Sequence, residues 1–309
     1  MAGMRFQAGL ILGALLCLPA AASAAGTGGA AGVPISHHRF GESRRSILHY
    51  WTPARIRGAD PRQVRVVGGG VPAPGASAQR RASNPVHEVP NYDVPPNNAN
   101  GKLLGRDSGG GYTCSATVVR SRNLNEIVTA GHCVHTIEFG WARKLLFIPA
   151  YHQGDAPFGK WAGREASAQR QWVRSENSNY DYAAIVLARS NKRAIQNVVG
   201  AARLAWNQDR QQDYHAVGYP GNHFSARRMV ACDSPFVRRD PFDATSGPAP
   251  SGIRCGDMGP GASGGGWWID GSFIDSVTSF GYAFEPSLVY GPYFNRDTKD
   301  LVRRAGRAR

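Results

Sequence analysis

The stretch Ile127-Val128-Thr129-Ala130-Gly131-His132-Cys133 joins a short run of β-formers to small residues and then to a histidine beside a cysteine. Ile, Val and Thr favour strands, and the small residues after them predict a sharp turn where the strand ends. A histidine side chain held at such a position can act as a general base. The stretch therefore predicts a strand that presents His132 at its end.

Two further stretches carry the partners that such a base needs. Asp181 opens the apolar run 182–187, and Ser263 lies within Gly259-Pro260-Gly261-Ala262-Ser263-Gly264-Gly265. A serine hydroxyl is a weak nucleophile until an imidazole takes its proton, and a carboxylate must hold that imidazole in place. We therefore interpret His132, Asp181 and Ser263 as catalytic residues. The alternative candidates for the role of Asp181 are Asp155, Asp209 and Asp213.

The glycines around Ser263 have a separate role. Backbone N–H groups converge on a developing oxyanion only where the chain turns sharply and no Cβ blocks the substrate. We place the oxyanion hole at the N–H groups of Gly261 and Ser263.

The rest of the chain predicts an all-β fold. With 38 Gly and 20 Pro in 309 residues, a helical bundle is disfavoured. Arg296 to Ala305, with Gly306 just past its end, is predicted to be a C-terminal helix. The β-prone runs are 113–119, 126–129, 144–148, 182–187, 214–217, 272–279 and 288–294.

The N-terminus shows the pattern of a secretory signal over residues 1–24, with Arg5, an apolar run and the triplet Ala22-Ser23-Ala24. No stretch is long enough to span a membrane. Loss of the signal removes Cys17 and leaves four cysteines, which in an oxidising compartment predicts two disulfides. Residues 25–94 are rich in Gly, Pro, Ser and Arg, and we expect a propeptide or flexible basic leader, not a packed domain. A catalytic domain would then span residues 95–309 of a secreted precursor.

The block 129–133, then Asp181 before an apolar strand, then Gly-x-Ser-Gly-Gly at 261–265 resemble, in this order, the chymotrypsin-like (trypsin-fold) serine peptidases. The likeness runs from about residue 101 to 294. Ala262 before the serine and Gly266-Trp267-Trp268 after it are similar to secreted bacterial V8-like and trypsin-like members. The resemblance implies two packed antiparallel six-stranded β-barrels, a catalytic cleft between them, and a serine endopeptidase that works through an acyl-enzyme.

The resemblance also implies further residue roles. Cys114 would bridge to Cys133, and Cys232 to Cys255. Ser279, Phe280 and Gly281 resemble the family's edge strand that pairs with the substrate backbone. Asp257 lies where trypsin-like members place the acid that selects Arg or Lys, although bacterial relatives carry Asp there without that preference.

One family feature is absent, because Ala262 stands where animal members have the Asp that pairs with a newly cut N-terminus. Arg65-Val66-Val67-Gly68-Gly69 resembles an activation site but lies far upstream of Cys114, and we interpret it as coincidence.

Composition leaves a second class of function open. The formal net charge is +14, which fits a secreted basic binding protein that keeps the fold but acts on anionic polymers. The basic tail 303–309 would give weak adhesion to an anionic cell wall. Our main expectation is a monomer that takes polypeptide substrates, uses no metal or other cofactor, and binds no specific nucleic acid.

Overall fold

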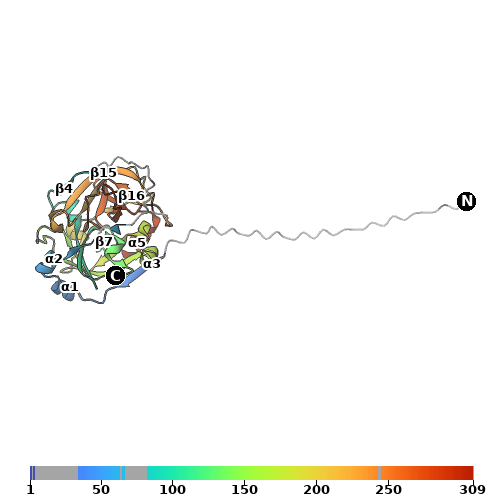
Figure 1. The fold of residues 1–309 in the computed structure, drawn as a ribbon. Helices are drawn as coiled ribbons and strands as arrows, with labels where there is room; N and C mark the ends of the chain where they lie inside the picture. Colours follow the sequence, from blue (N-terminus) through green and yellow to red (C-terminus); the bar gives the residue numbers. More distant parts are fainter. Residues whose placement is uncertain (2, 4–33, 63–64, 67–81, 243–244, 309) are drawn as a thin grey trace. The chain divides into compact units, whose positions relative to one another are not determined.

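The computed structural model describes residues 1, 3, 34–62, 65–66, 82–242 and 245–308, and Figure 1 shows their path. The expected signal, residues 1–24, falls outside the described part apart from Met1 and Gly3. Chain contacts group Gly32–Arg309 into one unit, which holds every helix and strand described below. Among the described residues, no helix is both long and apolar enough to cross a membrane.

The first sheet contains a closed antiparallel barrel, because β11 pairs with both β10 and β12. Around the barrel the strands are β5 (Asn100–Asp107), β6 (Gly110–Val119), β7 (Glu126–Thr129), β12 (Ala183–Leu187), β11 (Trp161–Gln169) and β10 (Arg143–Pro149). Ile127 and Val128 of β7 are fully buried between β6 and β12. Successive side chains of a strand point to opposite faces, so β7 is packed on both of its faces, and this fixes the end of β7 in space.

The second sheet supplies the other wall of the molecule. Its six central antiparallel strands are, in order, β18 (Phe273–Val277), β17 (Gly266–Ile269), β14 (Asp213–Gly218), β15 (Val230–Arg239), β16 (Ser251–Ile253) and β20 (Val289–Gly291). Shorter strands extend it, namely β13 (Arg203–Leu204), β19 (Phe280–Gly281), β3 (Arg65–Val66) and β4 (Val86–Glu88). A small separate hairpin joins β8 (His135–Thr136) to β9 (Gly140–Trp141).

In the described part of the chain, five α-helices lie outside the sheets: α1 (Arg44–Tyr50), α2 (Pro53–Arg57), α3 (Arg170–Ser175), α4 (Gln196–Val199) and α5 (Arg296–Ala305). The C-terminal helix α5 begins at a capping box, in which Asn295 accepts from the backbone of Thr298 at 3.3 Å. It buries Leu301, Val302 and Ala305. The all-β fold with a C-terminal helix is confirmed, and each of the seven β-prone runs contains a strand.

The expectation of an unpacked leader is wrong for residues 34–62. β1 (Ile35–Arg39) pairs antiparallel with β11, and β2 (Asp60–Pro61) pairs parallel with β6. Trp51 is 1% exposed, and its indole N–H donates to the carbonyl of Lys144 at 2.5 Å. The apolar residues of this segment are too sparse to form a core of their own, but each docks on the barrel.

Residues closer to the expected boundary at residue 95 are packed as well. β4 pairs with β15, and Val89 is 2% exposed. The packed body therefore includes residues on both sides of the expected start of the peptidase domain.

Candidate active site

His132 lies in the single turn of 3-10 helix Gly131–Cys133, directly after β7. A Cβ on Gly131 would come within 2.7 Å of the Trp172 ring and 2.9 Å of Asp181 Oδ1. Only glycine allows the turn to pack this closely. The imidazole ring centre lies 6.2 Å from that of Trp172, and His132 is 5% exposed.

Asp181 is brought to His132 by strand register. β12 pairs with β7 so that Ala183 lies opposite Thr129, and the two catalytic candidates sit just beyond that pair. Asp181 Oδ1 accepts from the His132 backbone N–H at 2.8 Å, and Oδ2 is 2.7 Å from His132 Nδ1. A third hydrogen bond comes from Ser279 Oγ, which donates to Oδ2 at 2.5 Å. The carboxylate thus fixes both the backbone and the ring of His132.

The same contacts decide the charge of Asp181. Burial alone would raise the pKa of this carboxyl group, but His132 and the hydrogen bonds from His132 and Ser279 outweigh burial and lower the pKa below its usual value. An ionised Asp181 can hold the proton on Nδ1 of His132, which leaves Nε2 as the basic nitrogen.

Ser263 comes from the second sheet, in the turn before β17. Its carbonyl accepts from the backbone N–H of Ser115 at 2.8 Å and lies 3.6 Å from the sulfur of Cys133. Ser263 is fully buried, and among the described residues neither its Oγ nor His132 Nε2 has a hydrogen-bond partner. The backbone of Ser263 therefore lies beside Cys133, the residue after His132, and no described hydrogen bond joins the side chains of Ser263 and His132.

The glycines near Ser263 are required by their surroundings. Gly261 has φ 96° and Gly264 has φ 82°, which is the region that favours glycine. A Cβ on Gly264 would clash with Thr129 Oγ1 and lie 2.5 Å from the carbonyl of Ser115. The N–H of Gly261 donates to the carbonyl of Arg62 at 2.6 Å.

Of the expected substrate-binding residues, Phe280 and Gly281 lie in a strand, whereas Asp257 lies outside the strands. Phe280 and Gly281 form β19, where Phe280 pairs with Tyr290. Asp257 is exposed, and its described hydrogen bonds use the backbone: its N–H donates to Ser83, and its carbonyl accepts from Asn222 and Gly259.

The contact of Ser279 with Asp181 was missed in the sequence, because nothing local indicates that the hydroxyl of this serine reaches a carboxylate 98 residues away.

Both disulfides join the cysteines as expected. The S–S bonds are Cys114–Cys133, with a sequence separation of 19, and Cys232–Cys255, with a separation of 23. The first ties the turn that holds His132 to β6, the strand whose Ser115 also contacts Ser263.

A metal centre does not fit this site. Among the described residues, Cys114, His132 and Cys133 form a trio with metal-type ligand atoms within 4.8 Å of one another. The two cysteines are bonded to each other, so neither offers the thiolate that binds a metal.

Solved structures with similar folds are peptidases. The protease Anisep from Arthrobacter nicotinovorans shares 30% identity over 72% of this chain and 100% of its own, with a TM-score of 0.65. The thermostable serine protease AL20 from an extremophilic microorganism shares 33% identity over 69% of this chain and 98% of its own, with a TM-score of 0.64. A Glu endopeptidase at 20% identity, with a TM-score of 0.61, shares the fold.

One curated protein matches over a shorter span. The extracellular metalloprotease of Bacillus subtilis (strain 168) is 37% identical over 76 residues, which are 25% of this chain and 23% of that protein. This chain therefore spans about a quarter of the length of the Bacillus protein. No family model matches the sequence.

Proposed function

The chain belongs to the chymotrypsin-like serine peptidases, and from this premise we propose that it is a secreted serine endopeptidase with Ser263 as nucleophile, His132 as base and Asp181 as the group that orients the base. The observation that carries the proposal is the buried Asp181–His132 pair, with 2.7 Å between Oδ2 and Nδ1, on the same strand framework that holds Ser263. Two disulfides are consistent with an oxidising extracellular location.

The proposed reaction has two halves, formation of the acyl-enzyme and its hydrolysis. Ser263 Oγ attacks the peptide carbonyl carbon while His132 Nε2 takes its proton, and the tetrahedral oxyanion accepts from the N–H groups of Gly261 and Ser263. His132 then gives the proton to the leaving amine, and the acyl-enzyme forms. Water, activated by His132, attacks the ester and releases the second product, which restores the serine hydroxyl.

The name of the Bacillus relative raises a metal-dependent alternative. The donor set around His132 argues against it here, since both neighbouring sulfurs are in a disulfide. Peptidase activity that resists a chelator and is lost with a serine-directed reagent would agree with the serine mechanism.

Labelling with a fluorophosphonate tests the proposal directly, before and after limited proteolysis of the leader. We expect labelling of the wild type that is lost in Ser263→Ala and His132→Ala but kept in Ser272→Ala, a control at an exposed serine. A wild type that stays unlabelled after the leader is cut away would contradict the proposed mechanism.

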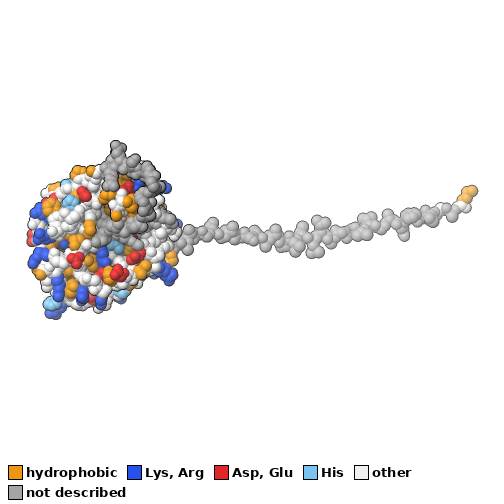
Figure 2. Space-filling view, viewed as in Figure 1, with side chains coloured by type: hydrophobic (Ala, Val, Ile, Leu, Met, Phe, Trp, Pro, Cys, Tyr) orange, Lys and Arg blue, Asp and Glu red, His pale blue; other side chains and the backbone are white. Residues whose placement is uncertain are grey.

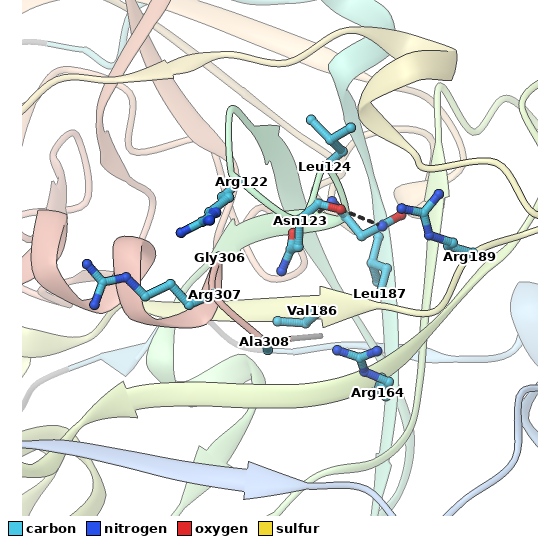
Figure 3. A pocket seen from close by; sticks show the side chains of 11 residues that line it. Arg122, Asn123, Leu124, Arg164, Val186, Leu187, Arg189, Gly306, Arg307 and Ala308 are labelled. Carbon is cyan, nitrogen blue, oxygen red and sulfur yellow. Dashed lines mark hydrogen bonds between the residues drawn. The ribbon is translucent and has the colours of Figure 1, made fainter.

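A second candidate function, binding of anionic polymers, is favoured by one cavity. A pocket of about 470 Å³ is lined by four arginines, with two from loops of the barrel, one from β11 and one past α5 (Figure 3). They are Arg122, Arg189, Arg164 and Arg307. The pocket also contacts Val186 and Leu187, at the end of β12 opposite Asp181, so it is separate from the candidate active site.

The remaining surface offers less support for that function. On the face shown in Figure 2, basic and acidic side chains are interspersed. Salt-dependent binding to an anionic polysaccharide that weakens in Arg122→Ala, and is unchanged in Ser263→Ala, would support a binding role beside catalysis. Binding that does not change with salt concentration, or that is unchanged in Arg122→Ala, would rule out this binding role.

A further inference from the structure

The leader residues Asp60–Arg62, called the leader segment below, run along the barrel strand that carries Cys114. β2 lies parallel to β6, opposite Tyr112–Thr113, and the N–H of Arg62 then donates to the carbonyl of Thr113 at 2.8 Å. Because Thr113 directly precedes Cys114, this pairing holds the leader segment beside the disulfide that ties down the turn of the catalytic histidine.

The backbone of the leader segment is hydrogen-bonded to an N–H group that the proposed catalysis needs as a donor. The carbonyl of Arg62 accepts from the N–H of Gly261 at 2.6 Å, and this N–H is the donor proposed for the oxyanion. A Cβ on Gly261 would lie 3.3 Å from Pro61 Cβ, so the segment packs closely against this turn. The nearby hydroxyl of Ser263 is fully buried. A substrate carbonyl cannot use the same N–H while Arg62 holds it.

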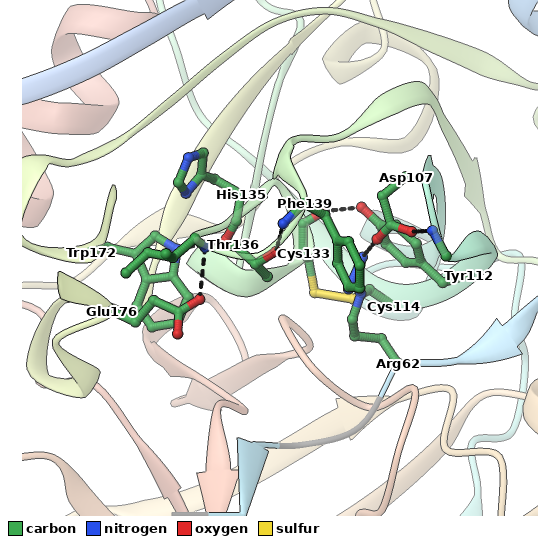
Figure 4. A network of polar contacts seen from close by, with 12 residues as sticks. Arg62, Asp107, Tyr112, Cys114, Cys133, His135, Thr136, Phe139, Trp172 and Glu176 are labelled. Atoms are coloured by element: carbon green, nitrogen blue, oxygen red, sulfur yellow. Dashed lines mark hydrogen bonds and ion pairs between the residues drawn. A yellow bond between two sulfur atoms is a disulfide. The ribbon is translucent and has the colours of Figure 1, made fainter. Parts of the chain in front are cut away.

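The side chain of Arg62 contacts the Tyr112 ring and the Asp107 carboxylate, and these two side chains together are called the arginine pocket below (Figure 4). Its guanidinium carbon lies 3.6 Å from the centre of the Tyr112 ring, and it forms an ion pair with Asp107. The Arg62 and Asp107 side chains are 16% and 6% exposed. A planar cation suits this pocket, since it can stack on an aromatic ring and bond to a carboxylate at once.

Both walls of the pocket are held in place by contacts of their own. Asp107 Oδ1 accepts from the N–H of Gly109 at 2.9 Å. The hydroxyl of Tyr112 donates to the carbonyl of Cys133 at 2.7 Å, which links the pocket to the residue after His132. The pocket is therefore part of the rigid framework of the active site.

The leader also reaches the second wall of the cleft. β3 pairs parallel with β19, with Arg65 opposite Phe280 and Val66 opposite Gly281. β19 holds Phe280 and Gly281, which are expected to pair with substrate backbone, and β3 occupies that side of it. The described parts of the leader thus contact the barrel at residues 60–62 and the second sheet at residues 65–66.

We infer that Asp107 and Tyr112 form a subsite that binds the guanidinium of an arginine side chain, and that Arg62 fills it so that the leader blocks Ser263 until the leader segment leaves. The inference rests on the proposed peptidase function for its consequence, the block, but not for the binding of arginine. After the leader segment has left, the same subsite is open to an arginine of a substrate.

The first experiment tests the anchor without any activity. In the full chain carrying Ser263→Ala, hydrogen exchange measured by mass spectrometry compares Arg62→Glu with Arg57→Ala, an exposed arginine of the same leader. Glutamate at residue 62 would face Asp107, so we expect amide exchange of residues 58–66 and 261 to speed up at least tenfold. Arg57→Ala should leave it unchanged. Unchanged exchange in a folded Arg62→Glu variant overturns the inference.

The second experiment tests the block in the chain with Ser263 intact. The rate of fluorophosphonate labelling should rise at least tenfold in Arg62→Glu, rise less in Arg62→Lys, which keeps the charge but loses the planar fork, and stay at the wild-type value in Arg57→Ala. Faster exchange with labelling at the wild-type rate would overturn the block and leave the arginine subsite. Faster exchange with no labelling of any variant, even after proteolysis of the leader, would count against the proposed function instead.

Discussion

Ser279 Oγ donates a 2.5 Å hydrogen bond to Asp181 Oδ2, the same oxygen that lies 2.7 Å from His132 Nδ1. The residue directly before β19 of the second sheet therefore contacts the carboxylate that comes from the barrel. We propose that Ser279 is a positioning residue, which would act through Asp181 and not on the substrate directly.

Replacing Ser279 should weaken catalysis more than binding. In Ser279→Ala, Asp181 loses one donor, and a hydrogen bond to a charged group contributes about 1.5–3 kcal/mol. We expect kcat to fall by roughly 10- to 100-fold with KM nearly unchanged. Steady-state kinetics on a peptide substrate measure this, with exposed Ser272→Ala as the control. A change confined to KM would mean that Ser279 serves the substrate and not Asp181.

Asp181→Asn should have a larger effect at the same site. An amide can present its NH₂ group to Nδ1 and so favour the wrong tautomer of His132, and in a related triad such a change lowers kcat by about 10⁴. We expect kcat to fall by about this factor at neutral pH, whereas the free energy of unfolding should change little. Activity close to that of the wild type would show that another carboxylate, such as Asp155, Asp209 or Asp213, orients the base.

Asp275 makes stability depend on pH. Burial raises the pKa of this carboxyl group to about 7, against the opposing effects of Tyr214 and Arg210. Since the folded pKa lies above the unfolded value, the folded state binds the proton more tightly. Its contribution to stability is complete below about pH 4 and is lost as the pH rises through about 7.

Asp275→Asn should remove that dependence. The gain in unfolding free energy over the wild type should be absent near pH 3.8 and grow up to about pH 7, by about 1.4 kcal/mol for each unit of the pKa shift. Urea unfolding at a series of pH values measures it. Exposed Asp270→Asn should give a difference that does not vary with pH, and a flat difference for Asp275→Asn would contradict the assignment.

The disulfide Cys232–Cys255 should stabilise the second sheet chiefly through the unfolded chain. Closing a loop with a separation of 23 residues contributes about 3 kcal/mol in the loop-entropy model. The double variant Cys232→Ser/Cys255→Ser should lose about this much unfolding free energy while keeping its labelling by fluorophosphonate if the fold is intact. A loss well below 1 kcal/mol would show that the bridge adds little.

Local sequence signals predicted the strands that are rich in β-branched and aromatic residues. β7 and α5 begin and end where the sequence analysis placed them, because β7 is a branched run closed by a turn and α5 has a cap at each end. β11 was missed. Its sequence, Trp161-Ala-Gly-Arg-Glu-Ala-Ser-Ala-Gln169, is poor in β-formers, and only pairing with β10, β12 and β1 makes it a strand.

The leader was misjudged for a related reason. Its apolar residues occur singly, so they gave no periodic pattern, yet Ile47 and Trp51 are each 1% exposed against the barrel. Short capping signals were present at Ser43 and Thr52, each of which accepts a hydrogen bond at the start of a helix. Contacts between distant segments, such as Arg62 with Asp107, have no local signal at all.

The split origin of the active site has a consequence for synthesis on the ribosome. His132 and Asp181 are both held by barrel strands, whereas Ser263 follows β16 of the second sheet and is joined to the barrel through the N–H of Ser115. A nascent chain that has completed the barrel would carry the base and its carboxylate but no nucleophile. The leader segment and its partner Asp107 are both synthesised before Ser263, so in the proposed mechanism the blocking contacts are already available when the nucleophile is added.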